Sequence, residues 1–249
     1  MKKISLSGML ATLLLLLFWG CGSTGEVRVQ ELPVPSREGG EPRLFVHGET
    51  ALLSWVEYLD DSTDALLFAR LEGDAWSAPR EIARGTNWFV NWADFPSVIA
   101  HPDNPRLLAA HWLQKSAPGT YDYRVMLSFS RDGGQSWSAP MSPHQDSIPA
   151  EHGFVTLLPQ PDERLLAVWL DGRQTKSGGA MTLRSALLDF EGHIYQADLL
   201  DERVCDCCST DAVQTPFGPL VAYRDRSESE IRDIALVRQT PKGWSPPHT

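Results

Sequence analysis

The chain has 249 residues, of which 42% are hydrophobic and 22% charged, and its formal net charge is −10. This composition is that of a globular protein, and it excludes collagen, coiled coil and a largely disordered chain. Because so acidic a surface repels phosphate backbones, we do not expect nucleic acid to be a partner.

The first residues have the features of an export signal. Lys2 and Lys3 precede an apolar run from Leu10 to Trp19. A bilayer span needs about 20 apolar residues, so this run is too short to cross a membrane, but it has the length of the apolar part of a signal peptide. We therefore predict a signal peptide over residues 1–20 and an exported protein.

A small residue followed by cysteine ends the apolar run. Gly20-Cys21 resembles the lipobox of bacterial lipoproteins. This resemblance implies that Cys21 carries a lipid, that residues 21–40 form a tether, and that the protein belongs to the cell envelope, at the outer membrane and facing the periplasm or the surface. The alternative is an ordinary secretory peptide that is cleaved elsewhere. We expect membrane contact only through this lipid anchor, and we leave the oligomeric state open.

The rest of the chain repeats. Four short apolar strands each end in an aromatic residue, and these residues recur at intervals of 54 to 57 positions: Trp55, Trp112, Trp169 and Tyr223. Each strand is followed by a polar loop, a second predicted strand and a turn that carries another aromatic residue. These second strands are predicted at Ala65–Arg70, Tyr123–Phe129, Met181–Leu188 and Ile231–Arg238. No helical periodicity separates them, and so regular a period indicates a repeat architecture.

Four copies of one antiparallel unit predict an all-β fold over residues 41–249. About four strands in every 50 to 60 residues is typical of a propeller blade. We therefore predict a β-propeller of four-stranded antiparallel blades, of which four are visible, with a β-sandwich as the alternative. The last strand of the fourth repeat would begin near Trp244, so we expect the N-terminal part of a longer protein, with a four-bladed ring as the alternative.

One turn matches a known repeat motif. Residues 130–137, Ser-Arg-Asp-Gly-Gly-Gln-Ser-Trp, fit the Asp-box pattern Ser-x-Asp-x-Gly-x-Ser/Thr-Trp of the bacterial neuraminidase repeat. The chain thus resembles the sialidase-like propellers, and this resemblance implies a ring of six blades. We expect Ser130, Asp132, Gly134 and Trp137 to be structural, with the aspartate bonding backbone N–H groups of the turn and the tryptophan packing into the blade.

The same resemblance implies a chemistry. Sialidases hold the substrate carboxylate with three arginines and use an aspartate as acid and base, with a tyrosine nucleophile paired with a glutamate. Arg43 is the nearest equivalent of the first arginine. Arg173, Arg224 and Arg232 could serve as later arginines by position only. No tyrosine stands in a matching motif, so we expect sialidase activity of a longer parent rather than of this chain alone.

Polar residues also collect on the loop face of the predicted blades, opposite the Asp-box turn. Arginine binds carboxylates, tryptophan stacks on sugar faces, and aspartate or glutamate moves protons, so this face suits a glycan or another anionic ligand. We predict catalytic roles for Asp94, Glu151 and Asp171, and substrate-binding roles for Arg43, Trp92, His152, Arg173, Arg224, Arg226 and Arg232. The alternatives are a capped turn at Asp94, an exposed loop pair at residues 151–152 and ion pairs within or between blades.

Three cysteines stand in one loop, at Cys205, Cys207 and Cys208. Export favours a disulfide that uses two of them, although Cys207 and Cys208 are poorly placed to bond each other. The alternatives are a soft-metal site and a free or redox thiol. We predict a disulfide and no metal or other cofactor.

These features favour an exported, sialidase-like propeller that acts on or binds glycans. As an enzyme it would be an exo-glycosidase of the exo-α-sialidase type. The alternative is a non-catalytic propeller that binds carbohydrate or protein, because a fold does not determine a function.

Overall fold

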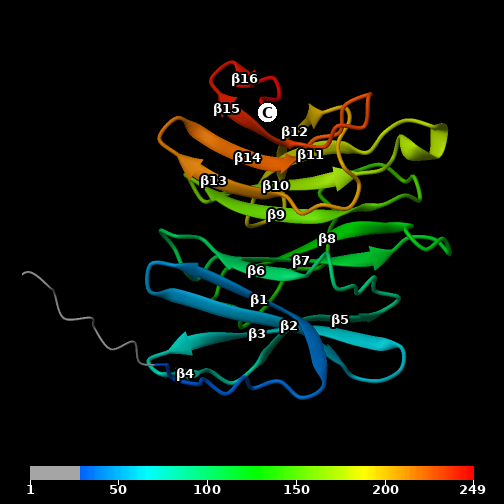
Figure 1. Cartoon of the computed structure of the whole chain (residues 1–249). Helices are drawn as coiled ribbons and strands as arrows, with labels where there is room; N and C mark the ends of the chain where they lie inside the picture. The colour runs from blue at the N-terminus through cyan, green and yellow to red at the C-terminus, as the bar shows by residue number, and fades with distance from the viewer. Residues whose placement is uncertain (1–28) are drawn as a thin grey trace, which may run out of the picture. The chain divides into compact units, whose positions relative to one another are not determined.

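The structure is a computed structural model that describes residues 29–249 (Figure 1). The predicted signal peptide, Cys21 and the predicted tether as far as residue 28 lie outside the described residues. The chain from Pro33 to Thr249 forms one compact unit. Strands make up nearly all of its regular structure, and the short 3-10 helix η2 (Thr175–Ser177) interrupts them once. No described helix has the length and apolar character needed to cross a membrane.

Four antiparallel sheets follow one another along the chain. The first contains β1 (Gly39–His47), β2 (Thr50–Tyr58), β3 (Thr63–Glu72), the short β4 (Ala75–Trp76) and β5 (Arg80–Thr86). The second contains β6 (Ser97–Ala100), β7 (Leu108–Lys115) and β8 (Tyr123–Ser130). The third contains β9 (His152–Gln160), β10 (Arg164–Asp171), β11 (Thr182–Asp189) and β12 (Ile194–Asp201). The fourth contains β13 (Asp211–Thr215), β14 (Gly218–Arg224), β15 (Ile234–Thr240) and β16 (Gly243–Trp244).

The predicted propeller of antiparallel blades is confirmed, with local differences. The second sheet has three strands, and Met141 pairs with Leu127 at the position of a fourth. In the fourth sheet, the last long strand starts at Ile234 rather than at the predicted Ile231. The reason is a tight turn before it, in which the Ser227 N–H donates to the Ile231 carbonyl at 2.9 Å. The segment after β16 pairs with β15, because His248 and Leu236 exchange two backbone hydrogen bonds of 2.8 and 3.0 Å.

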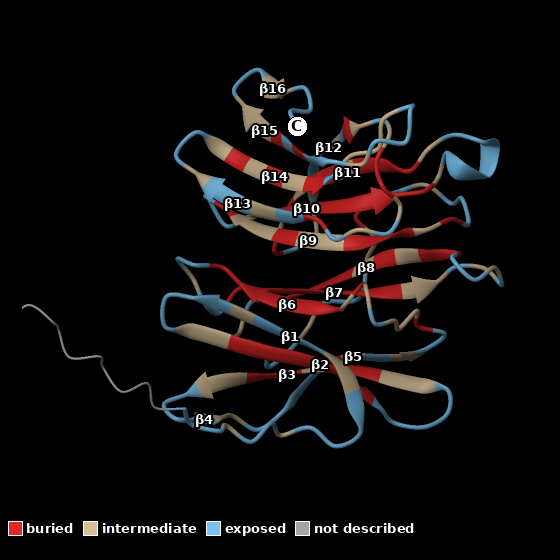
Figure 2. Cartoon of the chain, in the orientation of Figure 1, coloured by how far each residue is buried: buried red, intermediate tan, exposed pale blue. Residues whose placement is uncertain are grey.

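The sheets pack face to face, and each interface has its own apolar cluster. The buried residues accordingly lie mainly along the strands (Figure 2). Strand β10 shows why its sequence is a continuous apolar run. Trp169 joins a cluster shared with the second sheet, whereas Val168 and Leu170 join a cluster shared with the fourth. Successive side chains on a strand point to opposite faces, so a sheet covered on both sides buries every position. A third cluster joins the first and second sheets through Phe68 and Trp112, among others.

The opening strand of each sheet lies toward a shared centre. Strand β1 contacts β6, β9 contacts β13, and all four strands line one hollow of about 360 Å³. Residues at the ends of these strands therefore come together although more than 150 positions of sequence separate β1 from β13. The candidate site lies where these first strands of the four sheets meet.

The turn at residues 130–137 follows β8 and packs against the first sheet. Asp132 Oδ1 accepts hydrogen bonds from the backbone N–H groups of Gln135 and Ser136 at 2.9 and 3.0 Å, and the Ser136 hydroxyl donates to Asp132 Oδ2 at 2.6 Å. These bonds, that of the Ser136 side chain first, lower the pKa of Asp132. Gly134 has a φ of +84°, and a Cβ there would lie 2.3 Å from the Phe68 ring. Hydrogen bonds within the turn and close packing against Phe68 therefore hold these residues in place.

Candidate functional site

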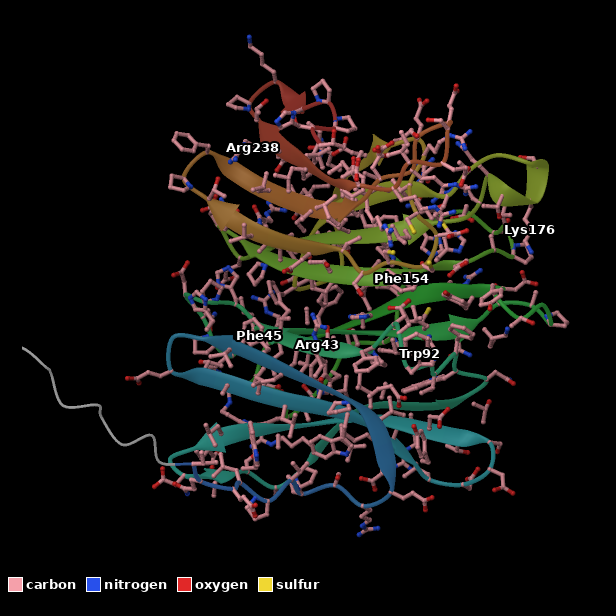
Figure 3. All side chains as sticks on the ribbon, in the orientation of Figure 1. Arg43, Phe45, Trp92, Phe154, Lys176 and Arg238 are labelled. Carbon is pink, nitrogen blue, oxygen red and sulfur yellow. The ribbon has the colours of Figure 1, made fainter. Side chains whose placement is uncertain are left out.

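A pocket of about 150 Å³ opens where the sheets meet at the centre. All four sheets or their connecting loops contribute to its wall, as Figure 3 shows for Arg43, Trp92 and Phe154, which lie near one another in the middle of the molecule. Its polar side chains are those of Arg43, Asp94, Ser97, His111, Ser209 and Thr210. The pocket therefore depends on packing between sheets rather than on any one of them.

Asp94 supplies the carboxyl group of this wall and is buried, with 4% of its surface exposed. The loop before β6 positions it, because Asn91 Oδ1 accepts the N–H groups of Ala93 and Asp94 at 2.9 and 3.1 Å. Across the interface, the Phe154 N–H donates to Asp94 Oδ2 at 2.6 Å. No cationic side chain forms an ion pair with Asp94 within the described part of the chain.

The backbone of β9 is shaped around this carboxylate. A Cβ on Gly153 would lie 2.1 Å from Asp94 Oδ2, so no larger residue fits there without displacing the carboxylate. The next residue, Phe154, has a φ of +53°, a left-handed conformation that is uncommon outside glycine. Strained backbone of this kind is often found at functional sites.

Burial raises the pKa of Asp94 to about 7, since removing a carboxylate from water disfavours its charged form. The Phe154 N–H opposes this rise, and the nearby charge of Glu151 adds to it. A carboxyl group with this pKa can both donate and accept a proton near neutral pH.

Glu151 is the second carboxylate beside the pocket. It accepts a hydrogen bond of 2.8 Å from the Tyr123 hydroxyl, and burial raises its pKa above the usual range. Tyr123 is itself fixed, because its ring stacks on that of Phe89 with centroids 4.1 Å apart. Glu151 does not line the pocket, but its charge acts on Asp94.

Three further side chains give the pocket its binding character. Trp92 stands at the rim with 86% of its surface exposed. The Arg43 guanidinium forms no ion pair with another described residue. Burial, with Arg43 nearby, lowers the pKa of His111 to about 3, so this imidazole is neutral, and its Nδ1 hydrogen bonds to Ser97 Oγ at 3.0 Å. His111 Nε2 is buried without a partner in the described structure.

Asp171 belongs to a different group of side chains at the end of β10. The Arg173 guanidinium binds it in a bidentate manner at 2.6 and 2.7 Å, and the Trp169 indole N–H donates to it at 2.8 Å. Burial opposes ionisation, but these partners and the nearby His152 lower the pKa of Asp171 to about 2. Arg173 also pairs with Asp146 at 3.1 Å.

The structure therefore divides the predicted site residues into three groups. Asp94, Arg43 and Trp92 line the central pocket, with Glu151 beside it. Asp171, Arg173 and His152 belong to a second group of charged side chains at the end of β10, which we call the buried network. Arg173 also lines a separate hollow of about 250 Å³. Arg224, Arg226 and Arg232 surround the cysteine loop and the adjacent Glu230. Of the five predicted arginines, the central pocket contains only Arg43.

Sequence reasoning missed His111, Ser97 and Thr210 in the pocket, and His144 and Asp146 in the buried network. The sequence pattern could have indicated one of them, because His111 is a polar residue within the otherwise apolar strand that ends at Trp112. Ser97 and Thr210 had none, since their role depends on which strands face the centre.

Three clusters within residues 29–249 have ligand atoms close enough to hold a metal ion. One of them, at residues 189–193, is largely exposed, and the other two are more buried. In the cluster of His144, Asp146 and His152, the Arg173 guanidinium already binds the carboxylate that a cation would need. That cluster is therefore better suited to hold the sheets together. The second cluster consists of the three cysteines.

Comparisons with known proteins identify the fold. No family model matches the chain, and no curated protein sequence matches it significantly. Among solved structures, an α-L-arabinanase from Penicillium chrysogenum complexed with arabinobiose superposes with a TM-score of 0.54 at 16% identity, over 83% of this chain and 63% of that one. The GH93 α-L-arabinofuranosidase of Fusarium graminearum gives 0.52 at 14%, over 87% and 67%. An endo-arabinase from Bacteroides thetaiotaomicron gives 0.51 at 9%, over 89% and 83%.

The chain thus spans about 63% of the length of the arabinanase that it resembles. At these identities the likeness concerns the fold alone. The narrower resemblance to sialidases, which rests on the turn at residues 130–137, stays a prediction. The chain has the β-propeller fold that these glycoside hydrolases also have.

Proposed function

We propose that this chain acts on glycans at the central pocket, as a glycoside hydrolase or as the part of one that carries these residues. One observation carries the proposal: Asp94 is a buried carboxyl group at a pocket wall that forms no ion pair with a cation of residues 29–249, and burial raises its pKa to about 7. Glycosidases need one carboxylic acid that stays protonated near neutral pH and a second carboxylate that is ionised.

Asp94 and Glu151 fit these two roles. Asp94 would protonate the leaving-group oxygen of the sugar. Glu151, which stands beside the pocket and is held by the Tyr123 hydroxyl, would be the ionised partner whose charge keeps the pKa of Asp94 raised. Burial raises the pKa of Asp94 to about 7, so this carboxyl group stays partly protonated near neutral pH and can supply the proton.

The wall of the pocket favours a sugar with at most one acidic group. Trp92 offers an exposed aromatic face on which a sugar ring can stack, and Arg43 offers one guanidinium. The exo-α-sialidase form of the proposal needs two more arginines at this pocket, and the other four predicted arginines bind partners elsewhere. Because two similar structures contain arabinobiose, arabinosides come first among the substrates to test.

The test is hydrolysis of a panel of fluorogenic glycosides by the purified chain. The panel includes α-L-arabinofuranoside, β-xyloside and α-sialoside, together with arabinobiose. We expect cleavage of at least one substrate, with a loss of at least 100-fold in kcat in Asp94→Asn and Glu151→Gln. Asp74→Asn, an exposed carboxylate in the turn between β3 and β4, is the matched control and should retain full activity.

The second candidate is a non-catalytic glycan-binding propeller, and the exposed face of Trp92 favours it. Isothermal titration with the same sugars separates the two. Binding without turnover, lost in Trp92→Ala and retained in Asp94→Asn, would support the binding module. Neither turnover nor binding in a folded protein would contradict both candidates.

A further inference from the structure

The loop between β12 and β13 brings three cysteine side chains to one point. Its start is fixed to two sheets, because the Val204 N–H donates to the Met181 carbonyl and the Cys205 N–H donates to the Arg224 carbonyl, both at 2.9 Å. Cys205 is accordingly buried, while Cys208 is half-buried and Cys207 exposed. The site therefore has one rigid ligand and an open side.

The three sulfur atoms have the spacing of ligands rather than of a disulfide. Cys205 Sγ lies 3.3 Å from Cys208 Sγ and 3.8 Å from Cys207 Sγ, and all three lie within 4.8 Å of one another. A disulfide bond needs about 2 Å. Three thiolates that each lie about 2.3 Å from one metal ion are about 3.8 to 4.0 Å apart. Small side-chain movements therefore convert the observed cluster into a three-sulfur metal site.

Two guanidinium groups face the sulfurs. Arg232 Nη1 lies 3.6 Å from Cys205 Sγ, and Arg224 Nη1 lies 3.7 Å from Cys208 Sγ. Arg232 also pairs with Glu230 at 3.2 Å. Cations beside sulfur favour the thiolate form, which is the form that binds metals. A disulfide is neutral and would leave these guanidinium groups without a negatively charged sulfur partner.

We propose that Cys205, Cys207 and Cys208 bind one soft monovalent metal ion, Cu(I), with Arg224 and Arg232 balancing the charge. Soft thiolate ligands select Cu(I) and zinc among the common metals. Structural zinc takes four ligands, and no fourth histidine, cysteine or carboxylate joins this cluster in residues 29–249. Three thiolates around Cu(I) carry two negative charges in total, and the guanidinium groups of Arg224 and Arg232, the latter shared with Glu230, lie beside them.

The test is an anaerobic titration of the fully reduced chain with Cu(I) presented as its bicinchoninate complex. We expect transfer of one Cu(I) per chain, and X-ray absorption should show three Cu–S contacts. Cys205→Ser, Cys207→Ser and Cys208→Ser should each lower the affinity at least 100-fold, and Arg224→Gln and Arg232→Gln about tenfold with an unchanged thiol count. Cys21→Ser, the fourth cysteine of the sequence, is the control and should bind as the wild type does.

Three results would overturn the proposal. The first is no transfer of copper to a chain with all thiols reduced and a native circular dichroism spectrum. The second is unchanged affinity in Cys207→Ser, which would leave only a two-sulfur site. The third is one tightly bound Zn(II) per chain that Cu(I) does not displace. The central pocket is not involved in this titration, so glycosidase activity in Asp94→Asn or wild type does not bear on the result.

Discussion

Asp94 and Asp171 are both buried carboxyl groups of the central sheets, yet their surroundings shift their pKa values in opposite directions. Asp171 has a bidentate arginine and an indole N–H, so its charge is compensated and its pKa falls to about 2. Asp94 accepts a backbone N–H and has no ion-pair partner among the described residues, and burial raises its pKa to about 7. The difference shows that pairing, rather than burial, separates a structural carboxylate from a candidate proton donor.

Removing the charge of Asp171 should have the largest effect on stability. Asp171→Asn leaves Arg173 and the rest of the buried network without their central anion, which costs about 3 to 5 kcal/mol in the free energy of unfolding. Urea denaturation at pH 7 measures it. Because the pKa of Asp171 is below the unfolded value of 3.8, the wild type should lose this contribution as the pH falls from about 4 to 2. A change below 1 kcal/mol would contradict the structural role.

The pH dependence of Asp94 should have the opposite sign. Its folded pKa of about 7 exceeds the unfolded value of 3.8, so the folded state binds more protons between these values. Stability should therefore fall as the pH rises from about 4 to 7, by up to about 4 kcal/mol. Asp94→Asn should remove this slope, which the difference between the two urea midpoints over pH 4 to 8 measures. Equal slopes in both proteins would place the Asp94 pKa near its ordinary value.

The catalytic assignment has its own pH signature. If Asp94 donates a proton in the reaction, kcat of the glycosidase should fall about tenfold per pH unit above 7, because the deprotonated form cannot act as the acid. A pH–rate profile on the best substrate checks this expectation. A rate that stays constant up to pH 9 would assign the proton donor to another group.

Trp169 tests how much one hydrogen bond from an uncharged donor contributes to the stabilisation of the Asp171 carboxylate. Trp169→Phe keeps an aromatic ring in the cluster between the second and third sheets but removes the donor to Asp171. We expect a loss of about 1.5 to 3 kcal/mol in the free energy of unfolding, since a hydrogen bond to a charged group contributes about this much. The loss should shrink in the Asp171→Asn background, and a double-mutant cycle measures the coupling.

An exposed ion pair provides the smallest effect. Arg131 and Glu191 form a salt bridge between two turns, and more than half of each side chain is exposed to solvent. Arg131→Ala should therefore change stability by less than about 0.5 kcal/mol. Chemical denaturation checks this value, and a loss above 1 kcal/mol would show that exposed pairs between blades also contribute.

The fold could be predicted from the sequence because apolar strands that end in an aromatic residue recur at a nearly constant interval. The apolar strands that end at Trp112 and Trp169 bury both faces, and a spacing of 57 residues between them leaves room for one blade. Site prediction was less complete. Asp94 and Glu151 stood out as polar residues near predicted strand starts, but charge alone could not separate Asp94 from Asp171, which has partners from several segments.

What the sequence could not provide was the register between blades. The carboxylate of Asp94 meets the N–H of Phe154, 60 positions away, only because the two sheets pack in one particular alignment. The gathering of the cysteine sulfurs likewise depends on the hydrogen bonds that fix Val204 and Cys205. Such contacts follow from tertiary packing and leave no local pattern.

The separate apolar clusters at each sheet interface have a consequence for cooperativity. Each sheet of the described unit buries its faces against its neighbours in the chain. Its energetics then resemble those of a one-dimensional array, in which every blade is stabilised by nearest-neighbour coupling. Amide hydrogen exchange should accordingly be slowest in β7 and β10 and faster in the first and fourth sheets, so local opening of these two sheets would remove their part of the pocket wall, such as Arg43 and Thr210, first.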